Sequence, residues 1–266
     1  MEYLVHCPAC DTTNRVEEVD RCPSCGARLA GEDVMLARRR EGSGADITVS
    51  TAEMEAMEEE AAEIGITPAM LMQEAGYQVA GLARRLCGPG DRVVIYAGAG
   101  NNGGDGLVAA RRLDGWGFDV TVVLASRELD DLPAEQLSIL ERLDVELRDD
   151  PVRHAAVVVD ALLGTGLEGA PREPYDTLIE AVNDASGETV TVDVPSGVEA
   201  DAGELFDPHV EADRTVMLGA AKRGLDGENA GELWTADIGL PAVVYERRGL
   251  EPKLFGDTSL LRLPDR

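Results

Sequence analysis

The fold of this chain is organised around residues 92–106, which read Arg92-Val93-Val94-Ile95-Tyr96-Ala97-Gly98-Ala99-Gly100-Asn101-Asn102-Gly103-Gly104-Asp105-Gly106. The apolar, β-branched run at 92–97 predicts a strand, and the composition of 107–113 suits a helix, so the pattern is strand, loop, helix. Glycine and asparagine tolerate positive φ and let a backbone approach a ligand closely. A loop that opens a helix directs free N–H groups at one point, which favours phosphate or another anion.

The 266-residue chain is strongly acidic, with 24 basic against 51 acidic residues and a net charge of -27. Only two of its basic residues are lysines, Lys222 and Lys253. Regular apolar segments alternate with the charged ones, so we expect a folded, heavily hydrated protein that is salt-adapted, with a simply very soluble protein as the alternative. Such a surface repels nucleic acid and anionic membranes, and no basic stripe offsets the repulsion. We therefore expect neither as a partner.

The first residues, Met1 to Cys7, show neither the charged region nor the long apolar region of a secretory signal. No later stretch reaches the roughly 18 uninterrupted apolar residues of a membrane span. We therefore expect a cytoplasmic protein.

Four of the five cysteines lie in the first 25 residues, in two pairs separated by eleven residues. The pairs are Cys7-Pro8-Ala9-Cys10 and Cys22-Pro23-Ser24-Cys25, and the segment resembles zinc ribbons. This spacing predicts a closed, structural Zn²⁺ site with Cys7, Cys10, Cys22 and Cys25 as ligands. A redox dithiol and unoccupied thiols are the alternatives. Because the segment is net acidic, it suits contact with another protein or a stabilising role better than DNA binding.

Two helices are expected before the glycine-rich stretch. Ser50 followed by Glu53 forms a capping-box pattern, and methionines recur behind it at helical spacing. Thr67-Pro68 then begins a second helix, with proline at its tolerated first position. We interpret the apolar stripes of both helices as core packing.

From residue 92 on, apolar strands alternate with helices, which is the signature of a parallel sheet covered on both faces. Further strands are expected at 120–124, 145–147, 155–163, 189–194, 215–218 and 232–236, and helices at 134–143 and 175–182. We divide the chain into a zinc-ribbon-like module at 1–33, a linker at 34–49, an α/β domain at 50–245 and a C-terminal tail at 246–266.

Three expected strands end in small-residue loops that carry an acid or an amide. These loops are Asn101 to Asp105, Asp160 with Gly164 to Gly166, and Asp193 with Ser196. Ligands bind beyond the carboxyl ends of strands in an open parallel sheet, so the three loops are expected to meet there. Each acid alone also suits a helix cap or a turn, but three together favour a site.

Residues 98–103 match G-x-G-x-x-G literally, which raises hydride transfer as a function. That fingerprint needs an acid about 20 residues later to hold the ribose, whereas the second strand ends Leu124-Ala125-Ser126-Arg127. No Tyr/Lys or His dyad for hydride transfer is evident either. An NADP-dependent oxidoreductase is therefore a second choice, beside a non-catalytic nucleotide-binding scaffold that binds a partner through its zinc module.

The three loop motifs, at 101–111, 160–167 and 193–203, resemble the NAD(P)H-hydrate epimerases, the YjeF N-terminal-domain family. Further matches lie at 71–76, 222–225 and 231–241, in the same order. The resemblance covers about residues 50 to 241 and leaves out the cysteine pairs.

The resemblance implies a Rossmann-like three-layer α/β/α fold with a mostly parallel sheet, usually a homodimer, that interconverts the R and S epimers at C6 of hydrated NADH or NADPH. It also implies K⁺ held by the residues matching Asn102, Asp160 and Ser196. The residues expected to contact substrate are Asn101, Asn102, Gly103, Gly104, Asp105, Gly164, Thr165, Gly166, Leu167, Glu168, Gly169, Ala170 and Asp193.

The C6 hydroxyl of the hydrate lies next to the ring nitrogen, so moving protons on and off its substituents lets it leave or lets the ring open. We expect Asp193 to be this acid–base group and Asp105 to orient the glycine-rich stretch. Lys222 either supports Asp193, neutralises phosphate or is a surface lysine. Replacing Asp193 by Asn is expected to leave folding and binding largely intact and to slow epimerisation by about 10²-fold or more.

The chain departs from the family pattern in two places. Gln73-Glu74 stand where the family often has Glu-Asn. After Pro241 only 25 residues follow, too few for a dehydratase domain, so a separate dehydratase is expected to act downstream.

Overall fold

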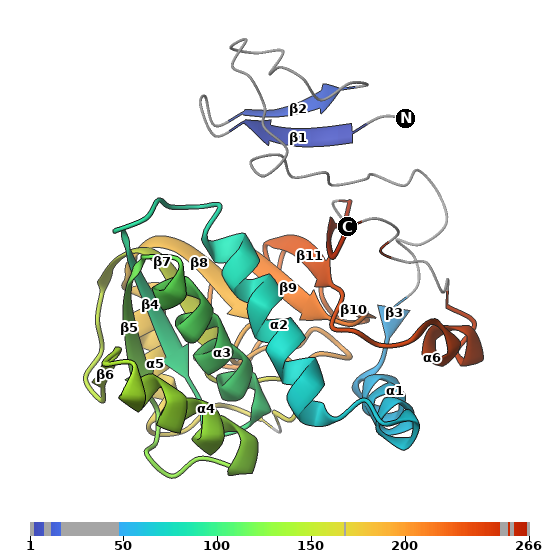
Figure 1. The fold of residues 1–266 in the computed structure, drawn as a ribbon, viewed down its shortest axis with the longest axis horizontal. Helices are drawn as coiled ribbons and strands as arrows, with labels where there is room; N and C mark the ends of the chain where they lie inside the picture. Colours follow the sequence, from blue (N-terminus) through green and yellow to red (C-terminus); the bar gives the residue numbers. More distant parts are fainter. Residues whose placement is uncertain are drawn as a thin grey trace.

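The computed structural model describes residues 48–167, 169–250, 255 and 258–264, and the backbone of 3–7 and 12–16. Its main sheet is built from β4 (Arg92–Ala97), β5 (Asp119–Leu124), β6 (Glu146–Arg148), β7 (His154–Ala161), β8 (Ser186–Val192), β9 (Arg214–Leu218), β11 (Glu232–Ala236) and β12 (Leu260–Arg262). The strand order is β12-β11-β9-β8-β7-β4-β5-β6 (Figure 1). All neighbours are parallel except β11 and β12. The prediction of an α/β fold on a mostly parallel sheet is confirmed.

Helices cover both faces of this sheet. They are α1 (Thr51–Ile64), α2 (Pro68–Ala83), α3 (Asn101–Gly115), α4 (Asp131–Arg142), α5 (Tyr175–Asn183) and α6 (Ala242–Arg247). On β4, Val93 and Ile95 pack with residues of α2, α3 and α4, whereas Val94 and Tyr96 pack with those of α5. Successive side chains of a strand point to opposite faces, so the uninterrupted apolar run of β4 is what both layers require.

The predicted beginnings of the first two helices are confirmed. The Ser50 side chain accepts a hydrogen bond from the Glu53 N–H, and the Glu53 side chain accepts one from the Ser50 N–H, which completes the capping box of α1. Thr67 caps α2 in front of Pro68. Both helices therefore begin where their local capping signals place them.

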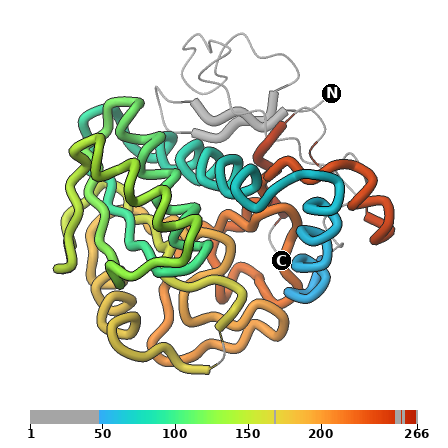
Figure 2. Tube along the Cα trace, turned by 60° about the horizontal axis from the view of Figure 1, so that its bottom comes forward, coloured from blue at the N-terminus to red at the C-terminus, as the bar shows by residue number. Residues whose placement is uncertain are grey.

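The start of helix α1 is held by hydrogen bonds to residues from the later part of the chain. Just before it, β3 (Thr48–Val49) pairs in parallel with β10 (Ala221–Lys222). In Figure 2 the blue segment that contains β3 lies beside the orange segment that contains β10. The Thr51 N–H also donates a hydrogen bond of 2.7 Å to the Asp201 carboxylate. Residues expected to be linker thus pair with a strand, and residues 260–262, expected in the tail, form β12 on the main sheet.

The glycine-rich stretch differs from expectation, because α3 begins at Asn101 and residues 101–106 are its first turns rather than a loop. None of the glycines between 98 and 106 has a positive φ. They are required by close packing: a Cβ on Gly103 would lie 2.0 Å from the Gly98 carbonyl oxygen, and one on Gly106 would lie 2.6 Å from the Ala161 Cβ. The first turns of α3 therefore lie directly against the ends of β4 and β7.

Near the N-terminus, β1 (Tyr3–Cys7) and β2 (Thr12–Val16) form an antiparallel pair. Cys10, Cys22 and Cys25 lie outside the described residues, so the zinc site stays a prediction. None of the described helices has the length and apolar character needed to cross a membrane.

Candidate functional site

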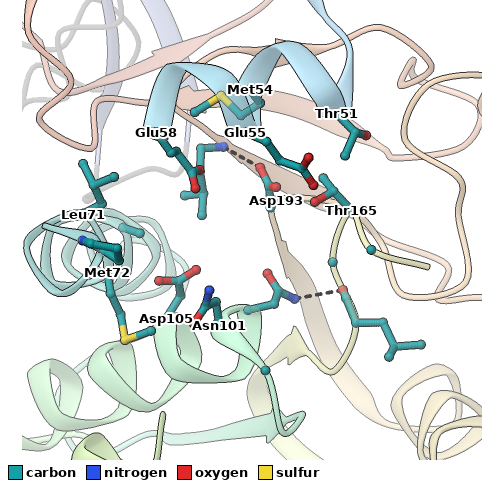
Figure 3. Close-up of a pocket in the computed structure, with 18 of the residues that line it drawn as sticks. Thr51, Met54, Glu55, Glu58, Leu71, Met72, Asn101, Asp105, Thr165 and Asp193 are labelled. Carbon is teal, nitrogen blue, oxygen red and sulfur yellow. Dashed lines mark hydrogen bonds between the residues drawn. The ribbon is translucent and has the colours of Figure 1, made fainter. Parts of the chain in front are cut away.

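A cavity of about 540 Å³ lies at the carboxyl ends of the central strands (Figure 3). Segments that follow β4, β7 and β8 line it, as the three-loop prediction requires. Helices α1 and α2 form the opposite wall. Its lining residues are Thr51, Met54, Glu55, Glu58, Pro68, Leu71, Met72, Ala75, Gly100, Asn101, Asn102, Asp105, Leu162, Leu163, Gly164, Thr165, Gly166, Leu167, Tyr175, Asp193, Leu218 and Ile238.

Asp193 is the first residue after β8 and has a left-handed backbone conformation, with φ of +65°. Aspartate tolerates this region better than most residues, although at some cost in strain. The turn directs the Asp193 carboxylate towards β9 and β10. There Oδ1 accepts a hydrogen bond of 2.8 Å from the Leu218 N–H and another from the ammonium group of Lys222.

Lys222 is fully buried, so the alternative of a surface lysine is wrong. Its Nζ forms an ion pair with Asp193 and donates a hydrogen bond of 2.7 Å to the Leu218 carbonyl oxygen. A buried ammonium is tolerated only when it is paired and hydrogen-bonded. The charge of Asp193, whose side chain is 14% exposed, is thereby compensated at the cavity surface.

Asp160, near the end of β7, is also fully buried. Its Oδ1 accepts hydrogen bonds from Ser196 Oγ (2.6 Å) and the Leu162 N–H (3.1 Å), and its Oδ2 accepts one from the Ser196 N–H (2.9 Å). Burial raises the pKa of Asp160 to about 6, although these three hydrogen bonds oppose the rise. No basic side chain within the described ranges forms an ion pair with it.

Oxygen atoms suited to a hard cation gather around Asp160. Ser196 Oγ accepts a hydrogen bond from the Leu163 N–H, and the Leu163 carbonyl oxygen accepts one from Asn102 Nδ2. The side-chain oxygen of Asn102 has no hydrogen-bond partner in the described part of the chain. The same part of the chain holds no group of three His, Cys, Asp or Glu side chains for a transition metal. A carboxylate, a carbonyl and neutral oxygens with one uncompensated negative charge fit K⁺.

Asp105, the fifth residue of α3, lies across the cavity from Asp193 (Figure 3). Only 7% of the residue is exposed, and its carboxyl group has no hydrogen-bond partner among the residues the structure describes. Burial raises its pKa well above the ordinary value, and the negative charges of Asp193 and Glu58 raise it further. No hydrogen bond in the described part of the chain therefore supports the expected role of Asp105 in orienting the glycine-rich stretch.

The predicted contact residues divide into two sets. Those lining the cavity are Asn101, Asn102, Asp105, Gly164, Thr165, Gly166, Leu167 and Asp193. Within the described ranges, Gly103, Gly104, Gly169 and Ala170 do not line it, and Glu168 lies outside those ranges. Gly104 instead lies against the Met72 side chain.

Sequence reasoning missed the wall formed by α1. Thr51 lies three and four residues before Met54 and Glu55, and Glu58 lies four and three residues after them, so the four residues share one face of that helix. Met54 and Met57 are buried as expected, but Glu58 lies four residues after Met54 and enters the same cavity. An acid placed in line with an apolar stripe was the signal that could have revealed this wall.

Comparison with known proteins finds relatives that match most of this chain. The bifunctional NAD(P)H-hydrate repair enzyme Nnr of Hyperthermus butylicus is 44% identical over 227 residues, covering 79% of this chain and 42% of that protein. The NAD(P)H-hydrate epimerase of Cenarchaeum symbiosum is 36% identical over 204 residues, covering 73% of this chain and 95% of that protein. The chain thus spans about two fifths of the length of its bifunctional relatives.

A solved structure shares the fold. The crystal structure of the yeast protein YNL200c matches with a TM-score of 0.72 and 28% identity, covering 82% of this chain and 100% of that one. Residues 68–224, more than half of the chain, match the family described as YjeF-related protein N-terminus. This chain belongs to the YjeF-related protein N-terminus family.

Proposed function

We propose that this protein is an NAD(P)H-hydrate epimerase, an isomerase that repairs damaged cofactor by interconverting the R and S epimers at C6 of hydrated NADH or NADPH. The observation that carries the proposal is the Asp193–Lys222 ion pair at the surface of the cavity. Two relatives named as epimerases, from Cenarchaeum symbiosum and Dehalogenimonas lykanthroporepellens, are covered over 95% and 80% of their length.

In this proposal Asp193 is the acid–base group. Epimerisation at C6 requires protons to move at the hydroxyl oxygen or the ring nitrogen, and a positioned carboxylate performs such transfers. Lys222 acts through Asp193, because its ammonium holds the carboxylate in place and compensates its charge. The backbone bond from Leu218 fixes the same oxygen from another direction.

Asn102, Asp160, Ser196 and the Leu163 carbonyl are the proposed K⁺ ligands. The cation would supply a positive charge that offsets Asp160 beside an anionic dinucleotide. Asn101, Asn102 and the residues at 164–167 would then hold the substrate, as lining residues of the cavity.

The test starts from one purified epimer of NADPH hydrate and follows the appearance of the other by proton NMR. The wild-type protein is expected to speed equilibration without consuming cofactor. Exchanging Asp193 for Asn together with Lys222 for Met is expected to slow it by about 10²-fold or more, because the acid–base group is absent. Absent acceleration by the wild type, or an unchanged rate in the double variant, would contradict the proposal.

The assembly expected from the family resemblance is part of the proposal. We propose a homodimer, a dehydratase activity that removes water from the repaired epimer, and a protein partner for the cysteine-containing N-terminal segment. Sedimentation of the full chain tests the dimer independently of activity.

A further inference from the structure

The cavity holds a second carboxyl group that the ion pair does not use. Only 7% of Asp105 is exposed, and its side chain points into the cavity opposite Asp193 (Figure 3). Its carboxyl group has no hydrogen-bond partner in the described part of the chain. Its carboxyl oxygens are accessible from the cavity, so a bound substrate can contact them directly.

Asp105 and Asp193 differ in their surroundings. Asp193 is compensated by the Lys222 ammonium and a backbone N–H, whereas Asp105 has neither. Burial and the neighbouring negative charges raise the pKa of Asp105 well above its ordinary value. An uncompensated carboxyl group that faces a carboxylate paired with an ammonium is a usual arrangement of an acid and a base in one site.

The groups that face Asp105 from the surrounding elements support this difference. Helix α1 contributes Glu58, and the turn after β8 contributes Asp193, both of which disfavour a charged Asp105. Lys222 on β10 opposes them but is already paired with Asp193. The α2 wall is apolar, with Leu71, Met72 and Ala75.

We propose that Asp105 is a second catalytic residue, a carboxylic acid that gives its proton to the C6 oxygen of the hydrate. The C6–O bond then breaks, water leaves, and the lone pair of the ring nitrogen forms the C6–N double bond. Water returns to the opposite face of C6 and loses a proton to Asp193. Exchange with solvent restores both carboxyl groups, so the reaction is balanced and needs no redox partner.

This inference rests on the proposed function and is tested with Asp105→Asn, which preserves shape and hydrogen-bonding capacity but transfers no proton. We expect kcat to fall by about 10²-fold. Binding of the 1,4,5,6-tetrahydro dinucleotide, which lacks the C6 hydroxyl, is expected to change by less than about threefold. A fall in wild-type kcat as pH rises should be absent in the variant, since Asp105 is the group whose proton is lost. Asp114→Asn, on the same helix outside the cavity lining, is the matched control and should behave as wild type.

Unfolding provides a readout that does not depend on activity. A raised pKa in the folded protein means that stability present in acid is lost as pH rises through that pKa. The stability of Asp105→Asn relative to wild type should therefore increase as pH rises above the ordinary range of a carboxyl group.

Three results would overturn the inference: an active wild type with an equally active Asp105→Asn, a loss of turnover confined to Glu58→Gln, or epimerisation in ¹⁸O-labelled water without label at C6. Failure of the proposed function is distinct, since then the wild type itself does not epimerise.

Discussion

At the scale of residues, the Asp193–Lys222 pair contains the proposed acid–base group and also affects the stability of the fold. The sequence-based expectation that Asp193→Asn leaves folding intact did not include a buried partner. Because Lys222 is fully buried, removing Asp193 leaves an ammonium without compensation. Breaking a buried pair from one side costs about 3–5 kcal/mol, whereas replacing both partners by apolar groups is often nearly neutral.

We therefore predict that Asp193→Asn lowers the free energy of unfolding by about 3–5 kcal/mol and that adding Lys222→Met recovers most of the loss. Lys222→Met alone should cost less, because the partly exposed Asp193 carboxylate is still accessible to water. Denaturant titration of the four proteins measures the cycle. A double variant as unstable as Asp193→Asn would show that the ion pair does not determine stability here.

At the scale of elements, the start of α3 depends on contact with the sheet rather than on backbone freedom. Gly103 has no room for a methyl group beside the Gly98 carbonyl, whereas Gly115 at the other end of the helix has nothing within 4 Å of a Cβ. Both glycines have ordinary negative φ values. They form a matched pair that separates packing from helix propensity.

Gly103→Ala is predicted to destabilise the protein by about 1–3 kcal/mol or more, because the new methyl group forces α3 away from β4. Gly115→Ala should be neutral or stabilising by up to about 1 kcal/mol, since alanine favours helix. Unfolding by denaturant gives both values. Equal stability of the two variants would refute close packing as the reason for the glycine at 103.

At the scale of the whole molecule, the net charge of -27 makes each buried carboxylate a cost to folding. Asp160 has a pKa raised to about 6 in the folded protein. Its contribution to stability is therefore complete in acid and is lost as pH rises from its ordinary value to about 6. A cation bound to the ionised form would recover that loss.

We predict that KCl raises the midpoint of thermal unfolding relative to choline chloride of equal ionic strength at about pH 8, and that the difference shrinks towards about pH 5. Asp160→Asn should abolish the difference between the salts. Scanning fluorimetry is sufficient for the measurement. A difference between the two salts that persists in the variant would show that K⁺ stabilises the protein at a site other than Asp160.

Local chemistry explains which features were predictable. The capping box at Ser50, the apolar run of β4 and the acids that end β7 and β8 all express short-range rules, and each is found in the structure where those rules put it. The first turns of α3 were not predictable in this way, because glycine suits both a loop and a helix packed tightly on a sheet. The α1 wall was missed because Glu58 resembles any exposed acid until α1 is placed over the cavity.

By itself, the sequence determined the alternation of strands and helices, the parallel sheet it requires, and the three loop motifs that resemble one family. Only the tertiary structure decided that Lys222 is buried against Asp193, that Asp105 lacks a partner and that α1 lines the cavity. The physical reason is that periodicity and capping act within a few residues, whereas burial and charge compensation arise between side chains brought together from distant segments.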